Sequence, residues 1–359
     1  MRILVLNWRD PAHPLAGGAE VYTAEILRRW AAAGHQVTLF AAAVAGRPAE
    51  ETVDGYRVVR AGGRFTVYRQ ARRWWRRHGR GHFDIVVDET NTVPFFAGEW
   101  VDDGARTVAL VHQTCEEIWH HNAPFPASYL GRYALEPWWL RRLGRGPILA
   151  VSESTRRSLA RFGAGQVRVV PEGFAPPPMD APPAREPTPT VVFCGRMVPY
   201  KRPADVVLAA TIAARTIPDL RVWMIGGGPQ LRRMRAGAPP GVEFLGWVDE
   251  ATKHDLMARA HAHVATSVRE GWGLVVTEAA ALGTPTIAYD VPGLRDSTRA
   301  AGGVLVPPEP QALARWLVEL LPRWMAGDFE PVPFGGARPW DEVADAVLAA
   351  VSECAHAAR

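Results

Sequence analysis

Residues 269–278 read Arg-Glu-Gly-Trp-Gly-Leu-Val-Val-Thr-Glu and indicate how the rest of the chain folds. The preceding residues 262–267 are β-prone, as in a buried strand, whereas residues 274–282 are rich in alanine and lack Gly and Pro. The pattern predicts a strand, a loop and a helix. Glycines let the loop backbone approach a ligand, and the unpaired N–H groups that open a helix attract anions. The segment therefore predicts a phosphate seat made by Gly271, Trp272, Gly273 and Leu274.

Two carboxylates bracket this predicted seat. Glu270 ends the expected strand, and Glu278 lies about one turn inside the expected helix. Carboxylates at this place are suited to hold sugar hydroxyls, although a simpler interpretation is that they complement the helix dipole. The spacing resembles the E-x7-E signature of the retaining glycosyltransferases of family 4, which have two Rossmann-like domains in the GT-B architecture. The resemblance implies that Glu278 binds the ribose of a donor nucleotide and that Glu270 faces the donor sugar.

Length and composition fit a globular protein of two domains. The chain has 359 residues, of which 48% are hydrophobic and 22% charged, enough to bury two cores. It contains no apolar run of about 18 residues, as a membrane span requires, and residues 1–6 are too short an apolar stretch for a secretory signal. The cysteines are odd in number and far apart, so we expect reduced thiols in a cytoplasmic protein, without a metal site. They are Cys115, Cys194 and Cys354.

The charge of the chain is mildly basic, with a net charge of +4 and an isoelectric point near 9.2. Arginine supplies nearly all of the basic residues, which is as typical of a GC-rich genome as of a nucleic-acid partner, and we expect no nucleic acid to bind. One segment, Arg69 to Arg80, has six arginines around Trp74 and Trp75. It predicts either a solvated helix whose tryptophans pack against the sheet, or a cationic helix in weak peripheral contact with the inner face of a membrane, with both tryptophans at the headgroup layer.

Strands and helices alternate in the first half, which predicts a parallel sheet covered on both faces. Residues 2–6 form the first expected strand and residues 21–33 the first expected helix, with Gly17 and Gly18 between them. Two glycines here either make a plain turn or place backbone N–H groups around an anion or a polar ligand. They resemble the GGAE-type loop of family 4, which lies beside the donor diphosphate and the acceptor.

His112 directly follows the expected strand 107–111. It should therefore lie at the carboxyl edge of the sheet, where open α/β sheets bind their ligands. A histidine at a strand end is commonly a hydrogen-bonded structural residue, but family 4 members commonly carry a histidine at the matching position. The resemblance implies that His112 contacts the donor sugar.

Two further segments of the first half are expected to be structural. Ser152 precedes a predicted helix and should cap it, with contact to an acceptor as the alternative. Residues 126–142 carry an apolar and aromatic set that should pack inside the protein. The set consists of Tyr129, Leu130, Tyr133, Leu135, Trp138, Trp139 and Leu140.

A proline-rich stretch divides the chain near its middle. Residues 175–189 contain seven prolines, which disrupt helices and sheet ladders, so we expect an extended linker. The resemblance implies an N-terminal, acceptor-side Rossmann-like domain of residues 1–174 and a nucleotide-sugar-binding domain of residues 190–330, with a cleft between them. In the same plan a C-terminal helix within residues 331–359 packs back on the first domain.

A basic loop follows the first expected strand of the second half. Gly195 and Arg196 begin the loop, and Lys201 comes five residues after the arginine. Both cations can converge on one diphosphate, because arginine offers a planar fork and lysine a point charge. The alternative is a solvated basic loop. The pattern is similar to a hallmark of family 4.

Three further segments are compared with the family. Gly227 lies in a glycine turn that matches a segment adjacent to the nucleotide, and Trp247 follows a strand in a segment whose backbone contacts the base. Trp247 is equally suited to fill the core. Residues 291–296 stand where family members usually show a Gly-Gly and a Glu, and this sequence differs. A sugar contact from that turn is therefore in doubt.

The resemblance implies a retaining, metal-independent transfer of a sugar from a nucleotide-diphosphate donor to a hydroxyl of a small-molecule, glycan or lipid-linked acceptor. Arg196, Lys201 and the helix start would stabilise charge on the departing diphosphate. No cofactor is expected beyond the nucleotide sugar, and no convincing DxD element is present. The alternatives are a GT-B nucleotide-sugar epimerase or hydrolase, and a catalytically degenerate binding homologue. A dinucleotide dehydrogenase is disfavoured because the chain lacks GxGxxG.

Overall fold

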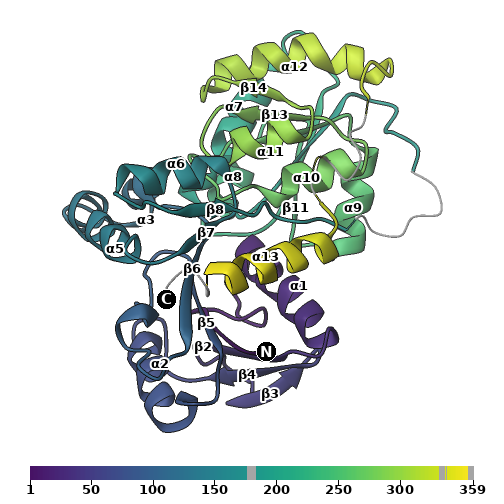
Figure 1. The fold of residues 1–359 in the computed structure, drawn as a ribbon. Coiled ribbons are helices and arrows are strands. Elements are labelled where there is room, and N and C mark those ends of the chain that lie inside the picture. Colours follow the sequence, from purple (N-terminus) through teal and green to yellow (C-terminus); the bar gives the residue numbers. More distant parts are fainter. Residues whose placement is uncertain (176–182, 331–335, 337, 355–359) are drawn as a thin grey trace. The chain divides into compact units, whose positions relative to one another are not determined.

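The computed structural model describes residues 1–175, 183–330, 336 and 338–354 (Figure 1), which form two compact units. Unit 1 comprises Met1–Glu116, Leu130–Gly173 and the described residues from Pro339 onward, and unit 2 comprises Glu117–Tyr129 and the described part of Phe174–Arg338. Each unit has its own sheet, so the predicted α/β fold with two Rossmann-like parts is confirmed. Residues 176–182 of the predicted linker lie outside the described residues, as do residues 331–335, 337 and 355–359 of the predicted C-terminal segment.

The sheet of unit 1 has eight strands in the order β3-β4-β2-β1-β5-β6-β7-β8. All neighbours are parallel except β3 and β4. Four of the five residues of β1 are buried, which explains its continuous apolar sequence in a sheet covered on both faces. The strands are β1 Arg2–Leu6, β2 Gln36–Ala41, β3 Glu50–Val53, β4 Tyr56–Arg60, β5 Ile85–Thr90, β6 Arg106–Val111, β7 Ile148–Ala150 and β8 Val167–Val169.

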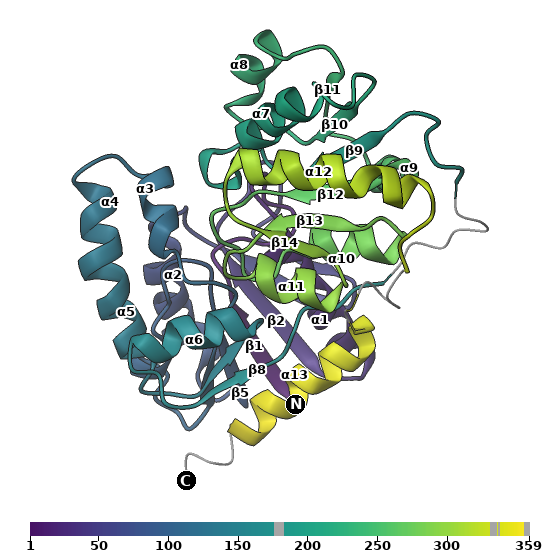
Figure 2. The same cartoon turned by 90° about the horizontal axis from the view of Figure 1, so that it is seen from above.

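Helices cover the sheet of unit 1, and α13 lies beside α1 at one face (Figures 1 and 2). The indole Nε1 of Trp30 in α1 donates to the Ala344 carbonyl of α13 at 3.0 Å, which fixes this pairing. The helical segments of the first half that lie in unit 1 are α1 Gly18–Ala32, α2 Val67–Trp74, η1 Trp75–Gly79, η2 Ala97–Glu99, η4 Gly131–Leu135, α5 Glu136–Leu143 and α6 Glu153–Arg161, and the last helix is α13 Trp340–Cys354. Two more, η3 Glu116–Ile118 and α4 Ala127–Leu130, lie where the two units divide the chain.

Helix α1 begins at Gly18, three residues before the predicted start. Gly17 precedes it in an extended conformation, and its N–H donates to the Glu20 carboxylate at 2.7 Å. This contact is half of a capping box and stabilises a first turn that glycine alone disfavours. Gly18 is therefore a helical residue and not part of a loop. At α6 the predicted cap is present, because Ser152 Oγ accepts the Thr155 N–H at 3.1 Å.

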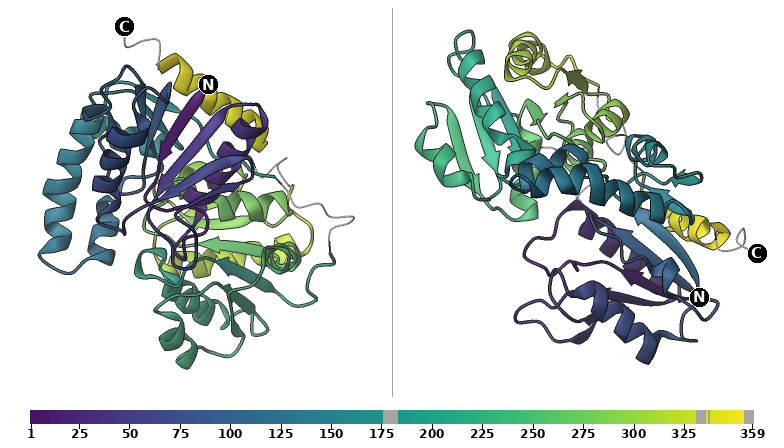
Figure 3. Two further views of the ribbon diagram at one scale, coloured as in Figure 1. Left: turned by 90° about the horizontal axis from the view of Figure 1, so that it is seen from below. Right: turned by 90° about the vertical axis from the view of Figure 1, so that its left-hand side faces the viewer.

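Unit 2 contains six parallel strands in the order β11-β10-β9-β12-β13-β14. Its strands are coloured from teal through green to yellow-green in Figure 3. Residues of α7 and α12 pack on one face of this sheet, and residues of α9 and α10 on the other. The strands are β9 Thr190–Cys194, β10 Arg221–Ile225, β11 Val242–Gly246, β12 Ala262–Ala265, β13 Thr286–Tyr289 and β14 Val304–Val306. The helices are α3 Trp119–Asn122, η5 Pro199–Lys201, α7 Pro203–Ala213, α8 Leu231–Ala236, α9 Glu250–Arg259, α10 Leu274–Ala281, α11 Leu294–Ala300 and α12 Pro310–Met325.

The strand order reverses once in each unit, between β1 and β5 and between β9 and β12. Chain segments leave such neighbouring strands in opposite directions, and ligands of open α/β sheets bind at the carboxyl ends of the strands there. We therefore expect ligand-binding residues in the loops after β1 and β5 in unit 1, and in the loops after β9 and β12 in unit 2.

The tryptophans of the basic segment Arg69 to Arg80 do not lie where the membrane hypothesis requires them. Trp75 is fully buried in the core of unit 1 and lies edge-on to Trp100, and Trp74 is half-buried against Phe40. The prediction that both tryptophans lie at a headgroup layer is therefore wrong. The buried residues of α2 and η1 are four positions apart, Val67, Ala71, Trp75 and Gly79, so Trp75 lies on the helix face that packs inward, as the alternative interpretation expected. Within the described residues, no helix is both long and apolar enough to cross a membrane.

The aromatic set of residues 126–142 is only partly buried. Leu140 is buried, but four members that were expected to pack inside are half or more exposed. Their helices each bury one face, so the side chains of the opposite face remain in solvent. The exposed members are Tyr129, Leu130, Tyr133 and Trp138.

Candidate active site

Two glycine-containing loops lie against each other at the carboxyl ends of β9 and β10 in unit 2. The Gly195 N–H donates to the Ile225 carbonyl at 3.0 Å, and the Met197 N–H donates to the Gly227 carbonyl at 2.7 Å. A Cβ atom on Gly226, whose φ is +122°, would lie 2.1 Å from the Gly195 oxygen. Only glycine permits this approach, which holds the loop with the predicted cations in place.

Arg196 and Lys201 are brought together around one aromatic ring. The Arg196 guanidinium donates to the Tyr200 hydroxyl, and both Arg196 Cζ and Lys201 Nζ lie 5.8 Å from the centroid of the Tyr200 ring. Lys201 also forms an ion pair with Glu270. Burial lowers the pKa of Lys201, but the charge and hydrogen bond of Glu270, together with Tyr200, more than offset burial, so the pKa is raised and the ammonium group stays charged.

Glu270 joins the β12 loop to the basic loop. Its Oε1 accepts hydrogen bonds from Lys201 Nζ and from Ser267 Oγ. Its N–H donates to the Pro292 carbonyl at 3.0 Å, and a Cβ atom on Gly293 would lie 2.2 Å from the Glu270 oxygen. The turn that departs from the family pattern therefore packs on the backbone of Glu270.

The start of α10 fits the predicted phosphate seat in its backbone geometry. Gly273 precedes the helix with a φ of +99°, and no side chain caps the first turn. The N–H groups that open α10 therefore have no side-chain acceptor. The side chain of Trp272 is buried and donates through Nε1 to Thr277 Oγ1 at 3.0 Å, so Trp272 contributes only its backbone to the seat.

Glu278 and Trp247 are the two other side chains that were predicted to lie near the nucleotide. Lys253 Nζ in α9 lies 2.9 Å from Glu278 Oε2, a contact that the sequence analysis missed. Trp247 is 75% exposed and its ring lies against Gly227, where a Cβ atom would be 2.7 Å from ring atoms. Trp247 is therefore a surface residue and does not fill the core.

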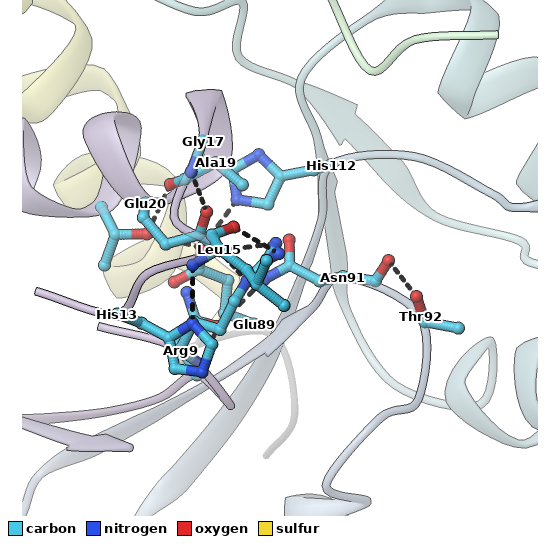
Figure 4. Close-up of polar contacts among 12 residues, drawn as sticks. Arg9, His13, Leu15, Gly17, Ala19, Glu20, Glu89, Asn91, Thr92 and His112 are labelled. Atoms are coloured by element: carbon cyan, nitrogen blue, oxygen red, sulfur yellow. Dashed lines mark hydrogen bonds and ion pairs between the residues drawn. The ribbon is translucent and has the colours of Figure 1, made fainter. Parts of the chain in front are cut away.

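In unit 1, the N–H of Gly17 is already engaged by Glu20 (Figure 4). Glu20 Oε1 in turn accepts from Arg9 Nε at 2.9 Å and from Asn91 Nδ2 at 3.2 Å. Burial raises the pKa of Glu20, and the charge of Arg9 opposes this shift. Gly18 follows as the first residue of α1, where helical N–H groups have no helical acceptor. The backbone available to a ligand therefore begins at Gly18.

His112 is buried between two glutamates at the edge of the same sheet. Its Nε2 lies 2.8 Å from Glu89 Oε1 (Figure 4), and its Nδ1 lies 3.7 Å from Glu172 Oε1. Burial lowers the pKa of His112, but Glu172 and Glu89 outweigh burial and raise the pKa to about 9. Both glutamates were missed in the sequence, although each follows or ends a strand at the carboxyl edge, as His112 does.

Two Rossmann-like units, one of which gathers paired cations and glutamates at its strand ends, define a glycosyltransferase of the GT-B class. Residues 16–176 match the model described as Glycosyltransferase Family 4, and residues 188–323 match the model described as Glycosyl transferases group 1. The chain belongs to glycosyltransferase family 4, as the resemblance implied.

Two relatives illustrate the similarity in sequence. The phosphatidyl-myo-inositol mannosyltransferase of Mycobacterium leprae is 33% identical over 198 residues, which cover 52% of each chain. The chain thus spans about half the length of this relative. The D-inositol 3-phosphate glycosyltransferase of Geodermatophilus obscurus is 28% identical, over 95% of this chain and 85% of its own.

Solved structures agree with the fold over nearly the whole chain. Sucrose-phosphate synthase from Thermosynechococcus elongatus has a TM-score of 0.71 and 22% identity, covering 99% of this chain and 98% of its own. Anabaena HepE in complex with UDP-glucose has a TM-score of 0.66 and 16% identity, covering 99% of both chains. At these identities the likeness concerns the fold.

Proposed function

We propose that this protein transfers a sugar from a nucleoside diphosphate to an acceptor hydroxyl, with retention of configuration and without a metal ion. The observation that carries the proposal is the meeting of Arg196, Lys201 and Glu270 at the carboxyl ends of β9 and β12. A departing diphosphate gains negative charge in the transition state, and each donor aimed at that charge contributes about 3 kcal/mol. A nucleotide-sugar donor is further supported by HepE, whose structure contains UDP-glucose.

The other site residues have distinct roles in this proposal. Glu278 binds the ribose, Glu270 and His112 orient the donor sugar, and the backbone of residues 271–274 receives the phosphate. Gly227 and Trp247 lie beside the nucleotide. The bond between the sugar C1 and the phosphate oxygen breaks, a bond from C1 to the acceptor oxygen forms on the same face, and the acceptor proton passes to the departing phosphate.

The acceptor is proposed from the names of the two relatives, which both specify an inositol-containing molecule, in one case a lipid. A lipid acceptor would place the enzyme at a membrane surface. The side chains of five arginines on α2 and η1 are exposed, and they are candidates for weak contact with anionic lipid. They are Arg69, Arg72, Arg73, Arg76 and Arg77.

The proposal is tested by incubating the protein with UDP-, GDP-, ADP- and dTDP-sugars and with myo-inositol phosphate or vesicles that contain phosphatidylinositol. Mass spectrometry identifies a glycosylated product, and proton NMR coupling at C1 gives its anomeric configuration. We expect the configuration of the donor. An inverted product contradicts retention, and release of free nucleotide or an epimerised sugar without acceptor supports the epimerase or hydrolase alternative.

A further inference from the structure

The imidazole ring of His112 lies between two buried carboxylates that come from different parts of unit 1. Glu89 is the penultimate residue of β5 and has a side chain that is 0% exposed, and Glu172 follows β8 and has a side chain that is 6% exposed. A carboxylate without water requires hydrogen bonds or a counterion to remain charged. Two buried carboxylates this close to one ring therefore favour a cation between them.

Other groups around the ring do not supply that counterion. From α1, the Tyr22 ring lies edge-on at 5.1 Å from the His112 ring, and Thr23 Oγ1 donates to Glu89 Oε1 at 2.5 Å. Arg9 is paired with Glu20. In the described part of the chain, His112 is the cationic side chain that pairs with Glu89 and with Glu172.

Both ring nitrogens of His112 face these carboxylates. An imidazolium has a donor on each nitrogen, whereas a neutral imidazole has one donor and one acceptor. An acceptor nitrogen placed toward a carboxylate is repulsive, so the two-sided arrangement fits the charged ring. The raised pKa of His112, about 9, agrees with this geometry.

We propose that Glu89 and Glu172 are positioning residues that hold the His112 ring between them as a cation, so that His112 acts as a fixed positive charge and not as a base. The catalytic part of this statement rests on the proposed sugar transfer. A ring that carries a proton on both nitrogens has no lone pair to accept the proton of an acceptor hydroxyl. The departing phosphate is then the group that takes this proton.

Ring nitrogen NMR on the full-length protein tests the charge state without any substrate. Histidine is labelled with ¹⁵N, the His112 signals are assigned by their loss in His112→Gln, and the pH is varied from about 6 to about 10. We expect imidazolium shifts for His112 at neutral pH, with a midpoint above about 8. A neutral ring at pH 7 in the wild type would overturn the proposal, and this arm needs no variant to fold except for the assignment.

Two isosteric variants and one control test the positioning role. Glu89→Gln and Glu172→Gln should each lower the His112 midpoint by about one pH unit or more, because each removes a negative charge that faces the ring. Tyr22→Phe keeps the ring contact and both carboxylates, and should leave the midpoint within about 0.3 unit. Equal midpoints in the wild type and both Gln variants would sink the proposal.

The pH dependence of kcat/KM separates a fixed cation from a base. If His112 acts as a fixed cation, kcat/KM should fall at alkaline pH as the ring loses its proton. Glu172→Gln should move this fall to lower pH by about one unit. Loss of activity as His112 gains a proton would identify a base and overturn the proposal. If every donor fails to turn over, the proposed function is wrong, while the NMR midpoints still decide the positioning role.

Discussion

Lys201 neutralises Glu270 before a donor binds, so the same ion pair bears on stability and on the proposed chemistry. The two side chains are 20% and 13% exposed. Removing one member of a buried pair leaves a charge without a partner and costs about 3–5 kcal/mol. Arg196 differs, because it donates to the neutral hydroxyl of Tyr200.

Replacing either cation should slow turnover by about a hundredfold, since about 3 kcal/mol of transition-state stabilisation is lost. Arg196→Ala should leave the melting temperature nearly unchanged. Lys201→Ala should lower the melting temperature as well as the rate, because Glu270 loses its ion-pair partner. Arg215→Ala, at an exposed arginine just after α7, is the matched control and should change neither property. Steady-state rates within threefold of wild type for Arg196→Ala would contradict the role of this cation.

The two glutamates should divide binding from turnover. Glu278→Gln should raise the donor dissociation constant, and Glu270→Gln should mainly lower kcat. Lys253→Met should reproduce part of the Glu278 effect, because Lys253 lies 2.9 Å from that carboxylate. Calorimetric titration and initial rates measure the two parameters, and equal losses of both in both variants would show that the roles are wrongly assigned.

At this scale, some site residues have a sequence signal and others do not. Arg196 and Lys201 stand in one short loop, and Glu270 and Glu278 flank one turn, so spacing alone makes them candidates. Glu89 follows Asp88 near the end of β5 and belongs to no motif that the sequence shows. Its importance depends on the pairing of β5 with β6, which sequence spacing does not contain.

Among the elements, the apolar runs predicted most strands because parallel strands are buried on both faces. The predicted strand 2–6 coincides with β1. The first residues of helices were harder to predict from the sequence. Gly18 disfavours a helix, and the first turn of α1 is recognised only from the contact between Glu20 and Gly17. Trp75 follows the buried residues Val67 and Ala71 at helical spacing, so periodicity agrees with its burial, but the sequence alone did not tell whether this face meets the sheet or a membrane.

The arginine face of α2 and η1 should bind anionic vesicles weakly, with roughly 1 kcal/mol from each arginine near the surface. Co-sedimentation with phosphatidylglycerol vesicles should exceed that with neutral vesicles and should fall as salt screens the charges. A fourfold Gln variant should lose this vesicle binding. Because the variant keeps the buried Trp75, the loss would be due to the arginines. The variant replaces Arg72, Arg73, Arg76 and Arg77.

A control for this experiment replaces four exposed arginines of other segments by Gln. It keeps the same net charge as the test variant, so equal sedimentation of the two variants would show that overall charge, and not the arginine face, drives binding. If wild type and test variant sediment alike, a soluble acceptor is favoured. The control residues are Arg157, Arg215, Arg232 and Arg233.

For the whole molecule, the proposed mechanism relies on fixed cations and helix N–H groups. Activity should therefore survive an excess of EDTA within about twofold, because no divalent ion is needed to neutralise the diphosphate. Initial rates before and after chelation provide the measurement. Abolition of activity that added Mg²⁺ or Mn²⁺ restores would refute the metal-free mechanism.

The sequence predicted two parts of α/β type because the strand-and-helix rhythm occurs on both sides of a proline-rich stretch. Proline content marks a linker, but it carries no signal for segments that return to another part of the fold. Glu117–Tyr129 groups with unit 2, and α13 packs on α1 of unit 1 through Trp30 and Ala344. The grouping of Glu117–Tyr129 depends on tertiary packing and becomes visible only in the structure, whereas a C-terminal helix on the first domain was already implied by the family resemblance.

The central claim is that unit 2 binds a nucleotide sugar through Arg196 and Lys201. Thermal unfolding of the wild type and of an Arg196→Ala/Lys201→Ala double variant, each with UDP-, GDP-, ADP- and dTDP-sugars, tests it most directly. A ligand at a hundred times its dissociation constant stabilises the folded state by about 2.7 kcal/mol. We expect one nucleotide class to raise the melting temperature of the wild type by several degrees and to leave that of the double variant unchanged. No shift with any nucleotide sugar, or equal shifts in both proteins, would contradict it.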